Sequence, residues 1–297
     1  MTRSVIFSQP LKSLYDVPAP AKLNLFLHIT GRRPDGYHLL QSAFMLIDWC
    51  DTLHFELRTD GQISRADLNS PVEGLHEALP AEDLAVRAAR ALQAASATTL
   101  GVHISLKKQI PSRAGMGGGS SDAASCLLAL QRLWGVRLPP LALRALALSL
   151  GADVPFFLSG GHAWVEGIGE KITPLTLPSA RFLVVKPAAG VSTQDIFGSS
   201  ELKRDTGTAT MLGFAAYANG PVFGFGCNDL QPVAQKLCPP IGQSLDWLES
   251  QQLQGRMTGS GSAVFAQILH DTDLPAAPGD WEIRKCRNLE MHPLAGW

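Results

Sequence analysis

The stretch PSRAGMGGGSS, residues 111–121, decides the fold because it lies between two segments of clear and different periodicity. Residues 102–107, VHISLK, alternate apolar and polar side chains and predict a half-buried strand. Residues 122–134 carry apolar side chains at helical spacing. A strand that feeds a glycine-rich loop and then a helix predicts an anion site, since glycines allow close backbone approach and the helix N-terminus presents free N–H groups.

The composition of this loop favours phosphate binding over a flexible linker or an ordinary tight turn. Four glycines occupy the five positions 115–119, which is more than a turn requires. No Gly-Lys-Ser/Thr follows, so the loop is not a Walker A motif, and no acidic residue completes a dinucleotide fingerprint. The serine hydroxyls add donors or reach a metal ion. The residues predicted to bind phosphate are Pro111, Ser112, Arg113, Ala114, Gly115, Met116, Gly117, Gly118, Gly119, Ser120 and Ser121.

Length and composition limit the class of protein. The chain has 297 residues, 45% hydrophobic and 17% charged, which predicts one large or two medium domains with a sizeable core. The net charge of −1 argues against a nucleic-acid partner. The five cysteines show no CxxC spacing, so zinc and a disulfide framework are poorly supported and free thiols in a reducing compartment are expected.

The termini and apolar stretches carry no targeting or membrane signal. The apolar run near the N-terminus is too short for a signal peptide, and the stretch 138–152 is interrupted by Arg144. We therefore expect a soluble cytoplasmic protein without a membrane partner, in which residues 1–17 form a loose extension. The oligomeric state stays open, and a homodimer is one alternative.

An early strand brings two polar side chains together. Residues 21–29 alternate, which predicts that Lys22, Asn24, Phe26 and His28 share one face and the leucines the other. The strand is strongly hydrophobic, so an inward-facing lysine requires an acidic partner or a ligand. The pattern alone does not separate this interpretation from a solvated lysine.

A turn and an aspartate are two further candidate positions. Asp35-Gly36 predicts a tight turn, and Tyr37 and His38 follow it, either packed against the turn or at the edge of a cleft. Asp153 follows a helix end and precedes a proline. The local pattern favours an Asx turn, and the alternative is a carboxylate in a partly dry pocket that accepts a proton.

The second half of the chain predicts a helix opening and a second small-residue loop. Residues 192–195 resemble a capping box, and on pattern alone Phe197 in the following helix belongs to the core. Residues 257–262, MTGSGS, precede a strand. They either support the first loop and line the cleft or simply connect two strands.

Other patterns predict the remaining elements. We expect strands at 39–47 and 51–57, no chemical signal at 58–80, a helix capped by Asp83 and another that ends at Leu150. The residues Asn228 and Asp229 are expected to cap a later helix. The polar break between Pro174 and Pro178 predicts a domain boundary.

Three motifs in order, at residues 20–24, 111–121 and 257–262, resemble the GHMP kinase superfamily. Within it, residues 31–38 and 151–157 most resemble the family of 4-diphosphocytidyl-2-C-methyl-D-erythritol kinases. The resemblance implies an α+β, two-domain GHMP kinase fold. The implied domains are an ATP-binding domain at 14–173, like domain 2 of ribosomal protein S5, and a ferredoxin-like domain at 174–297, with the active site between them.

The same resemblance implies the chemistry. Asp153 is the implied base and Lys22 its neighbour, with ATP as phosphoryl donor and Mg²⁺ bridging the phosphates. The implied acceptor is the 2-hydroxyl of 4-diphosphocytidyl-2-C-methyl-D-erythritol, a step in the non-mevalonate isoprenoid pathway. The implied substrate-binding residues are Asn24, Tyr37, His38, Thr193 and Phe197.

Two alternatives remain at this stage. One is another GHMP small-molecule kinase, acting on homoserine or mevalonate, against which residues 35–38 argue. The other is a non-catalytic ligand sensor of GHMP type, which the presence of both Lys22 and Asp153 disfavours. No acidic residue is assigned to Mg²⁺, for which Ser121 is a candidate ligand, and the adenine pocket is unassigned.

Overall fold

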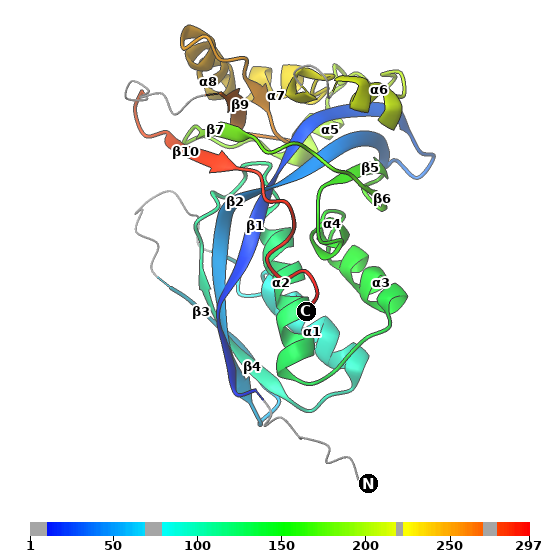
Figure 1. Ribbon diagram of the computed structural model, residues 1–297, viewed down its shortest axis with the longest axis vertical. Helices are drawn as coiled ribbons and strands as arrows, with labels where there is room; N and C mark the ends of the chain where they lie inside the picture. The colour runs from blue at the N-terminus through cyan, green and yellow to red at the C-terminus, as the bar shows by residue number, and fades with distance from the viewer. Residues whose placement is uncertain (1–10, 69–78, 218–221, 270–277) are drawn as a thin grey trace.

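The computed structural model describes residues 11–68, 79–217, 222–269 and 278–297. Two β-sheets, each with its own helices, follow one another along the long axis of the molecule (Figure 1). The first pair of strands runs from one sheet to the other and connects them. None of the described helices is both long and apolar enough to cross a bilayer.

The larger sheet has the order β3-β4-β2-β5-β6, with β1 paired to β2. Helices α1 to α4 pack on one side of it (Figure 1) and bury a core of aliphatic and phenylalanine side chains. Its elements are β1 (Ser13–Arg32), β2 (His38–Arg58), β3 (Ile63–Asp67), α1 (Leu84–Ser96), β4 (Gly101–Lys107), α2 (Gly118–Leu133), α3 (Pro140–Leu150), α4 (Val154–Leu158), β5 (Ala163–Gly167) and β6 (Lys171–Pro174).

The smaller sheet is antiparallel throughout, in the order β10-β7-β9-β8. Its helices complete a second core, which also receives the distal part of β1. Its elements are β7 (Arg181–Lys186), α5 (Thr193–Gly198), α6 (Met211–Ala216), the 3-10 turn η2 (Val222–Gly224), α7 (Gln231–Leu237), α8 (Pro239–Ser250), β8 (Arg256–Met257), β9 (Val264–Ile268) and β10 (Glu282–Arg287).

Local signals predicted several element ends correctly. Asp83 caps α1, where its Oδ1 accepts a hydrogen bond from the backbone N–H of Val86 at 3.0 Å. Gly135 follows α2 with φ of 65°, a left-handed conformation that suits glycine at a helix C-terminus. Ser192 caps α5 as the capping-box pattern predicted.

Three expectations for the elements were wrong. Residues 13–17 belong to β1, and the two strands expected at 39–47 and 51–57 are the single strand β2. The N-cap position of α7 is Leu230, without a side-chain cap hydrogen bond, so Asn228 is not the N-cap. Its Oδ1 accepts the N–H of Leu230 at 3.0 Å just before the helix, and its Nδ2 donates to the carbonyls of Met257 and Gly259 in the 257–262 loop. In each case pairing with a distant segment outweighed the local pattern.

A β-bulge in β1 changes which side chains face the site. Asn24 pairs with Phe44 and Leu27 with Ser42, so β1 contains one more residue than β2 across this interval. The extra residue reverses the alternation after Leu25. Phe26 therefore packs with Leu25 in the apolar cluster, whereas Leu27 lines a cavity beside Asn24. The expectation that Phe26 and His28 share the face of Lys22 was wrong for this reason.

The chain leaves the larger sheet after β6 and enters the smaller sheet with β7. Its C-terminal segment then returns to the larger sheet. The backbone N–H of Leu289 donates to Leu46 O at 3.0 Å, and Leu294 is buried in the core that α1 to α4 form. In the other direction, Leu27 and Ile29 of β1 contribute to the core of the smaller sheet. Through these contacts, the two sheets and their helices both pack against the strands that carry the site.

Candidate active site

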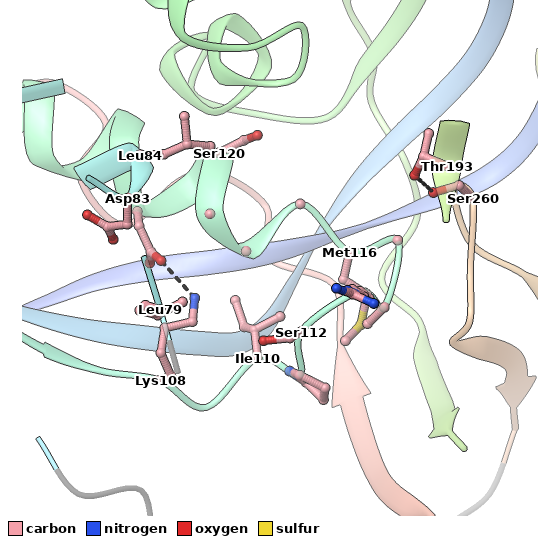
Figure 2. Close-up of a pocket in the computed structure, with 18 of the residues that line it drawn as sticks. Leu79, Asp83, Leu84, Lys108, Ile110, Ser112, Met116, Ser120, Thr193 and Ser260 are labelled. Carbon is pink, nitrogen blue, oxygen red and sulfur yellow. Dashed lines mark hydrogen bonds and ion pairs between the residues drawn. The ribbon is translucent and has the colours of Figure 1, made fainter. Parts of the chain in front are cut away.

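The glycine-rich loop forms the wall of a cavity of about 800 Å³ at the start of α2 (Figure 2). Residues 111–120 line it together with the first turn of α1, Lys108 and the start of α5. Gly115 and Gly117 both have φ of 72°, which side chains rarely adopt. A Cβ atom at Gly115 would lie 2.2 Å from Thr258 O, so the close approach of the two loops requires glycine there.

Hydrogen bonds unite the three sequence motifs into one structure. The N–H of Lys22 donates to Met116 O at 3.0 Å. The N–H of Ser262 donates to Arg113 O at 2.9 Å, and that of Ala263 to Ala114 O at 3.2 Å. Thus the 257–262 loop supports the glycine-rich loop from behind, while its Ser260 lines the cavity. The expectation of a supporting, cleft-lining second loop is confirmed over that of a simple connection.

Replacing Gly115 by alanine is expected to reduce stability. The added Cβ would collide with Thr258 O and would hold φ in an unfavourable region, which together cost about 2–4 kcal/mol. We expect a lower melting temperature in thermal unfolding. The matched control is Gly207→Ala, at an exposed position where the added Cβ has no neighbour within 4 Å. Parental stability of Gly115→Ala would contradict the close approach of the two loops.

A second cavity of about 560 Å³ adjoins the first. The two share Gly115, Gly117, Ser120, Thr193 and Ser260, so a ligand in one lies next to a ligand in the other. The second cavity brings together both predicted catalytic residues and all predicted substrate-binding residues, namely Lys22, Asp153, Asn24, Tyr37, His38, Thr193 and Phe197.

Lys22 and Asp153 meet in the second cavity although they lie far apart in sequence. Lys22 Nζ is 3.7 Å from Asp153 Oδ2, and the side chains are 4% and 31% exposed. Asp153 occupies the N-cap position of α4 but makes no side-chain cap hydrogen bond, so the Asx-turn interpretation is wrong. The carboxylate instead faces the cavity and the ammonium group.

The surroundings of Lys22 both desolvate and orient its ammonium group. Burial lowers the pKa of Lys22, and the nearby Asp153 carboxylate opposes that shift. Nζ also donates to Asn24 Oδ1 and lies 4.7 Å from the centre of the Phe44 ring, a cation–π contact. Asn24 is itself fixed, since its Nδ2 donates to Ser42 Oγ at 2.9 Å and its backbone N–H to Thr258 Oγ1 at 2.9 Å.

Aromatic side chains also line the second cavity, and hydroxyl side chains lie where it meets the first. The His38 and Phe197 rings lie 4.9 Å apart at an angle of 34°. Phe197 is half-buried: it packs against the core of the smaller sheet, as its sequence pattern alone favoured, and it also lines the cavity. Tyr37 is 61% exposed at the rim, and Thr193 Oγ1 hydrogen-bonds Ser260 Oγ at 2.7 Å.

A buried cluster of charges beneath the glycine-rich loop was not anticipated from the sequence. Lys108 Nζ contacts Asp122 Oδ2 at 2.7 Å and also Asp51 Oδ2, and Figure 2 shows it at the cavity wall. Burial lowers the pKa of Lys108, but the two carboxylates outweigh it and raise the pKa overall. Asp51 also accepts the N–H of Ile110 at 2.8 Å, which fixes the strand leading into the loop.

The serine that reaches the cavities is Ser120. It lines both of them, whereas Ser121 is fully buried, lines neither, and its Oγ has no hydrogen-bond partner among the described residues. Successive helical residues point about 100° apart, and this step turns the Ser121 side chain into the core, away from both cavities. Among the described residues, no group of three or more His, Cys, Asp and Glu could hold a metal ion.

Comparisons with known proteins agree with this geometry. The family model described as GHMP kinases N terminal domain matches residues 83–161, and GHMP kinases C terminal matches residues 212–279. The chain is 84% identical over 297 residues, all of both chains, to 4-diphosphocytidyl-2-C-methyl-D-erythritol kinase of Polaromonas naphthalenivorans (strain CJ2).

Two solved structures show the same fold. The crystal structure of a 4-(cytidine 5'-diphospho)-2C-methyl-D-erythritol kinase is 34% identical with a TM-score of 0.70, covering 86% of this chain and 90% of that one. Homoserine kinase from Cytophaga hutchinsonii has a TM-score of 0.67 at 16% identity, covering 90% of this chain and 88% of that one, and supports the fold alone. The chain has the two-domain α+β GHMP kinase fold and belongs to the 4-diphosphocytidyl-2-C-methyl-D-erythritol kinase family, enzymes that transfer a phosphoryl group to an alcohol.

Proposed function

We propose that the enzyme transfers the γ-phosphoryl group of ATP to the 2-hydroxyl of 4-diphosphocytidyl-2-C-methyl-D-erythritol, in the non-mevalonate route to isoprenoid precursors. The single observation that carries the proposal is the Lys22–Asp153 pair, 3.7 Å apart in the cavity that adjoins the glycine-rich loop. The high identity to a relative of that name supports the choice of substrate.

In this proposal the first cavity binds ATP. The backbone N–H groups of the glycine-rich loop and the first turn of α2 hold the phosphates, aided by the positive end of the helix dipole. The γ-phosphoryl group lies near Ser120, where the two cavities meet. Residues 14–173 then form the ATP-binding domain and residues 174–297 the C-terminal domain.

The proposed chemistry is an in-line displacement at phosphorus. Asp153 accepts the proton of the 2-hydroxyl as the oxygen bonds to the γ-phosphorus, and the bond from that phosphorus to the bridging oxygen of ADP breaks. Lys22 attracts and orients the Asp153 carboxylate and stabilises negative charge on the transferring group. Its burial strengthens both effects, because little water screens the ammonium group.

Residues that line the second cavity are proposed to hold the substrate. Phe197 and Tyr37 offer aromatic faces to the cytosine ring, beside His38. Asn24 and Thr193 hydrogen-bond the methylerythritol portion, close to Lys22. The lining therefore passes from aromatic to polar along the direction from base to reacting alcohol.

Mg²⁺ fits this site only with the nucleotide as its main ligand. The hydroxyls of Ser120, Thr193 and Ser260 lie at the junction of the cavities, and no group of three or more His, Cys, Asp and Glu among the described residues could hold the ion by itself. Ser120 and the phosphate oxygens would thus hold the ion, which neutralises phosphate charge.

A cytoplasmic setting matches the free thiols of all cysteines in the chain.

The proposed substrate can be tested by a coupled assay of ADP release. With ATP and Mg²⁺ present, we expect turnover with the cytidine-diphosphate-linked alcohol and at least about 10³-fold lower kcat/KM with homoserine or mevalonate, whose smaller size leaves the aromatic end empty. The control omits the alcohol and measures ATP hydrolysis alone. Preferred turnover of homoserine or mevalonate would overturn the proposal in favour of another GHMP kinase activity.

A further inference from the structure

Arg204 connects His38 to the end of α5. Its Nε donates to His38 Nε2 at 3.0 Å. The remaining guanidinium nitrogens donate to the backbone carbonyls of Leu202 at 2.9 Å, Phe197 at 3.1 Å and Ser199 at 2.8 Å. Four hydrogen bonds thus hold the guanidinium in one orientation, and none of the signals in the sequence pointed to it.

The donor character of arginine determines the state of the imidazole. Arginine has N–H donors and no acceptor, so His38 Nε2 must accept, which requires a lone pair on that nitrogen. A neutral imidazole with an unprotonated Nε2 carries its proton on Nδ1. Among the described residues, His38 Nδ1 has no hydrogen-bond partner, and this side chain lines the second cavity.

We propose that Arg204 is a positioning residue that keeps His38 neutral with its proton on Nδ1, so that the substrate cavity offers an N–H donor to an acceptor atom of the base. The inference rests on the proposed function, in which this end of the cavity binds cytosine. Cytosine presents acceptors at N3 and O2, whereas uracil carries an N–H at N3. A donor from Nδ1 to N3 therefore fits cytosine and meets a second N–H in uracil, so with N3 as the acceptor the tautomer that Arg204 imposes favours cytosine.

The charges around His38 act in the same direction. Burial lowers the pKa of His38, and the neighbouring cations Arg204 and Arg32 lower it further. Phe197, which stacks on the ring, adds no charge. The imidazole consequently stays neutral at physiological pH, and Arg204 alone decides which nitrogen carries the proton.

Removing Arg204 would produce an unusual pH dependence. A neutral imidazole without a fixed partner exchanges between two tautomers, so Nδ1 would carry a proton only part of the time. Below the pKa of His38, which burial and Arg32 still hold under its ordinary value in such a variant, both nitrogens carry protons and the Nδ1–H donor returns. Substrate binding in such a variant should therefore improve as the pH falls.

The kinetic test compares Arg204→Met with Arg204→Lys. At about pH 8 we expect Arg204→Met to raise KM for the cytidine substrate roughly 5- to 10-fold with kcat nearly unchanged, and lowering the pH to about 5, well under the ordinary pKa of histidine, should restore most of the loss. Arg204→Lys keeps a donor beside Nε2 and should retain a KM close to that of the parent at both pH values. Arg137→Met, at an exposed position outside both cavities, is the matched control.

Arg204 also closes the end of α5, so a purely structural role must be distinguishable. A structural role predicts that KM rises equally at every pH, and that result would overturn the proposal. A second measurement uses the parent protein without substrate, so it remains decisive if Arg204→Met does not fold. Nitrogen-15 NMR of the histidine rings, assigned with His38→Gln, should show a protonated Nδ1 and an unprotonated Nε2 at about pH 7.

The opposite tautomer, or an imidazolium at that pH, would contradict the proposal. The NMR result is independent of the substrate assignment. If the parent does not phosphorylate the cytidine-linked alcohol, the proposed function fails while the tautomer is still determined. If the parent is active and the NMR shows the other tautomer, only the role of Arg204 fails.

Discussion

Replacing Asp153 by asparagine is expected to lower kcat by about 10²- to 10⁴-fold, the usual contribution of a positioned general base. The amide has the shape of the carboxylate but cannot accept the proton of the attacking hydroxyl. Asp153 lines the second cavity and not the first, so ATP binding should be nearly unchanged. Single-turnover phosphorylation and a separate measurement of ATP affinity would resolve the two effects.

The control for Asp153→Asn is Asp246→Asn, an exposed carboxylate on α8 outside both cavities, which should behave like the parent. Normal turnover by Asp153→Asn would show that the base is assigned wrongly. A parent protein that binds ATP but shows no turnover with any alcohol would instead support the ligand-sensor alternative.

Replacing Lys22 by methionine is expected to reduce kcat by about 10²- to 10³-fold, similar to the loss of one preorganised group that stabilises transition-state charge. The variant keeps the length of the side chain, but Asp153 loses its cation and Asn24 Oδ1 loses a donor. KM should change less than kcat, because the lost charge acts mainly in the transition state. Steady-state kinetics with both substrates would measure the difference.

The pH profile gives a second test of Lys22. Since burial lowers its pKa, the ammonium group loses its proton at lower pH than an exposed lysine does. Activity of the parent should therefore fall on the alkaline side below the ordinary lysine range, and this limb should be absent from the residual activity of Lys22→Met. Lys171→Met, at an exposed position on β6, is the control. An unchanged alkaline limb in Lys22→Met would assign it to another group.

Features that depend on neighbouring residues were predictable from the sequence. The glycine-rich loop lies between a strand and a helix with distinct periodicities, and the caps at Asp83 and Ser192 follow from residue types at fixed spacing. The resemblance of three motifs to one superfamily then indicated that Lys22 and Asp153 lie together, which neither local pattern could decide. Their separation of 3.7 Å agrees with that expectation.

Features that depend on pairing between distant segments were not predictable in the same way. The bulge that turns Leu27 toward the cavity requires the register of β1 against β2. The cluster of Asp51, Lys108 and Asp122 requires the interior of β2, the end of β4 and the start of α2 to meet. Arg204 lies in a polar segment with no periodicity, so nothing in its surroundings in the sequence indicates a contact with His38.

The hydrogen bonds that join the three sequence motifs also constrain when, during synthesis, this protein can bind its nucleotide. The backbone N–H of Asn24 bonds a hydroxyl 234 positions further along the chain, and the glycine-rich segment has its support only once residue 263 has left the ribosome. At ordinary translation speed that delay is on the order of 10 s after the segment itself emerges. A nascent chain that ends before this point should therefore bind triphosphate poorly, however well its first helices have formed.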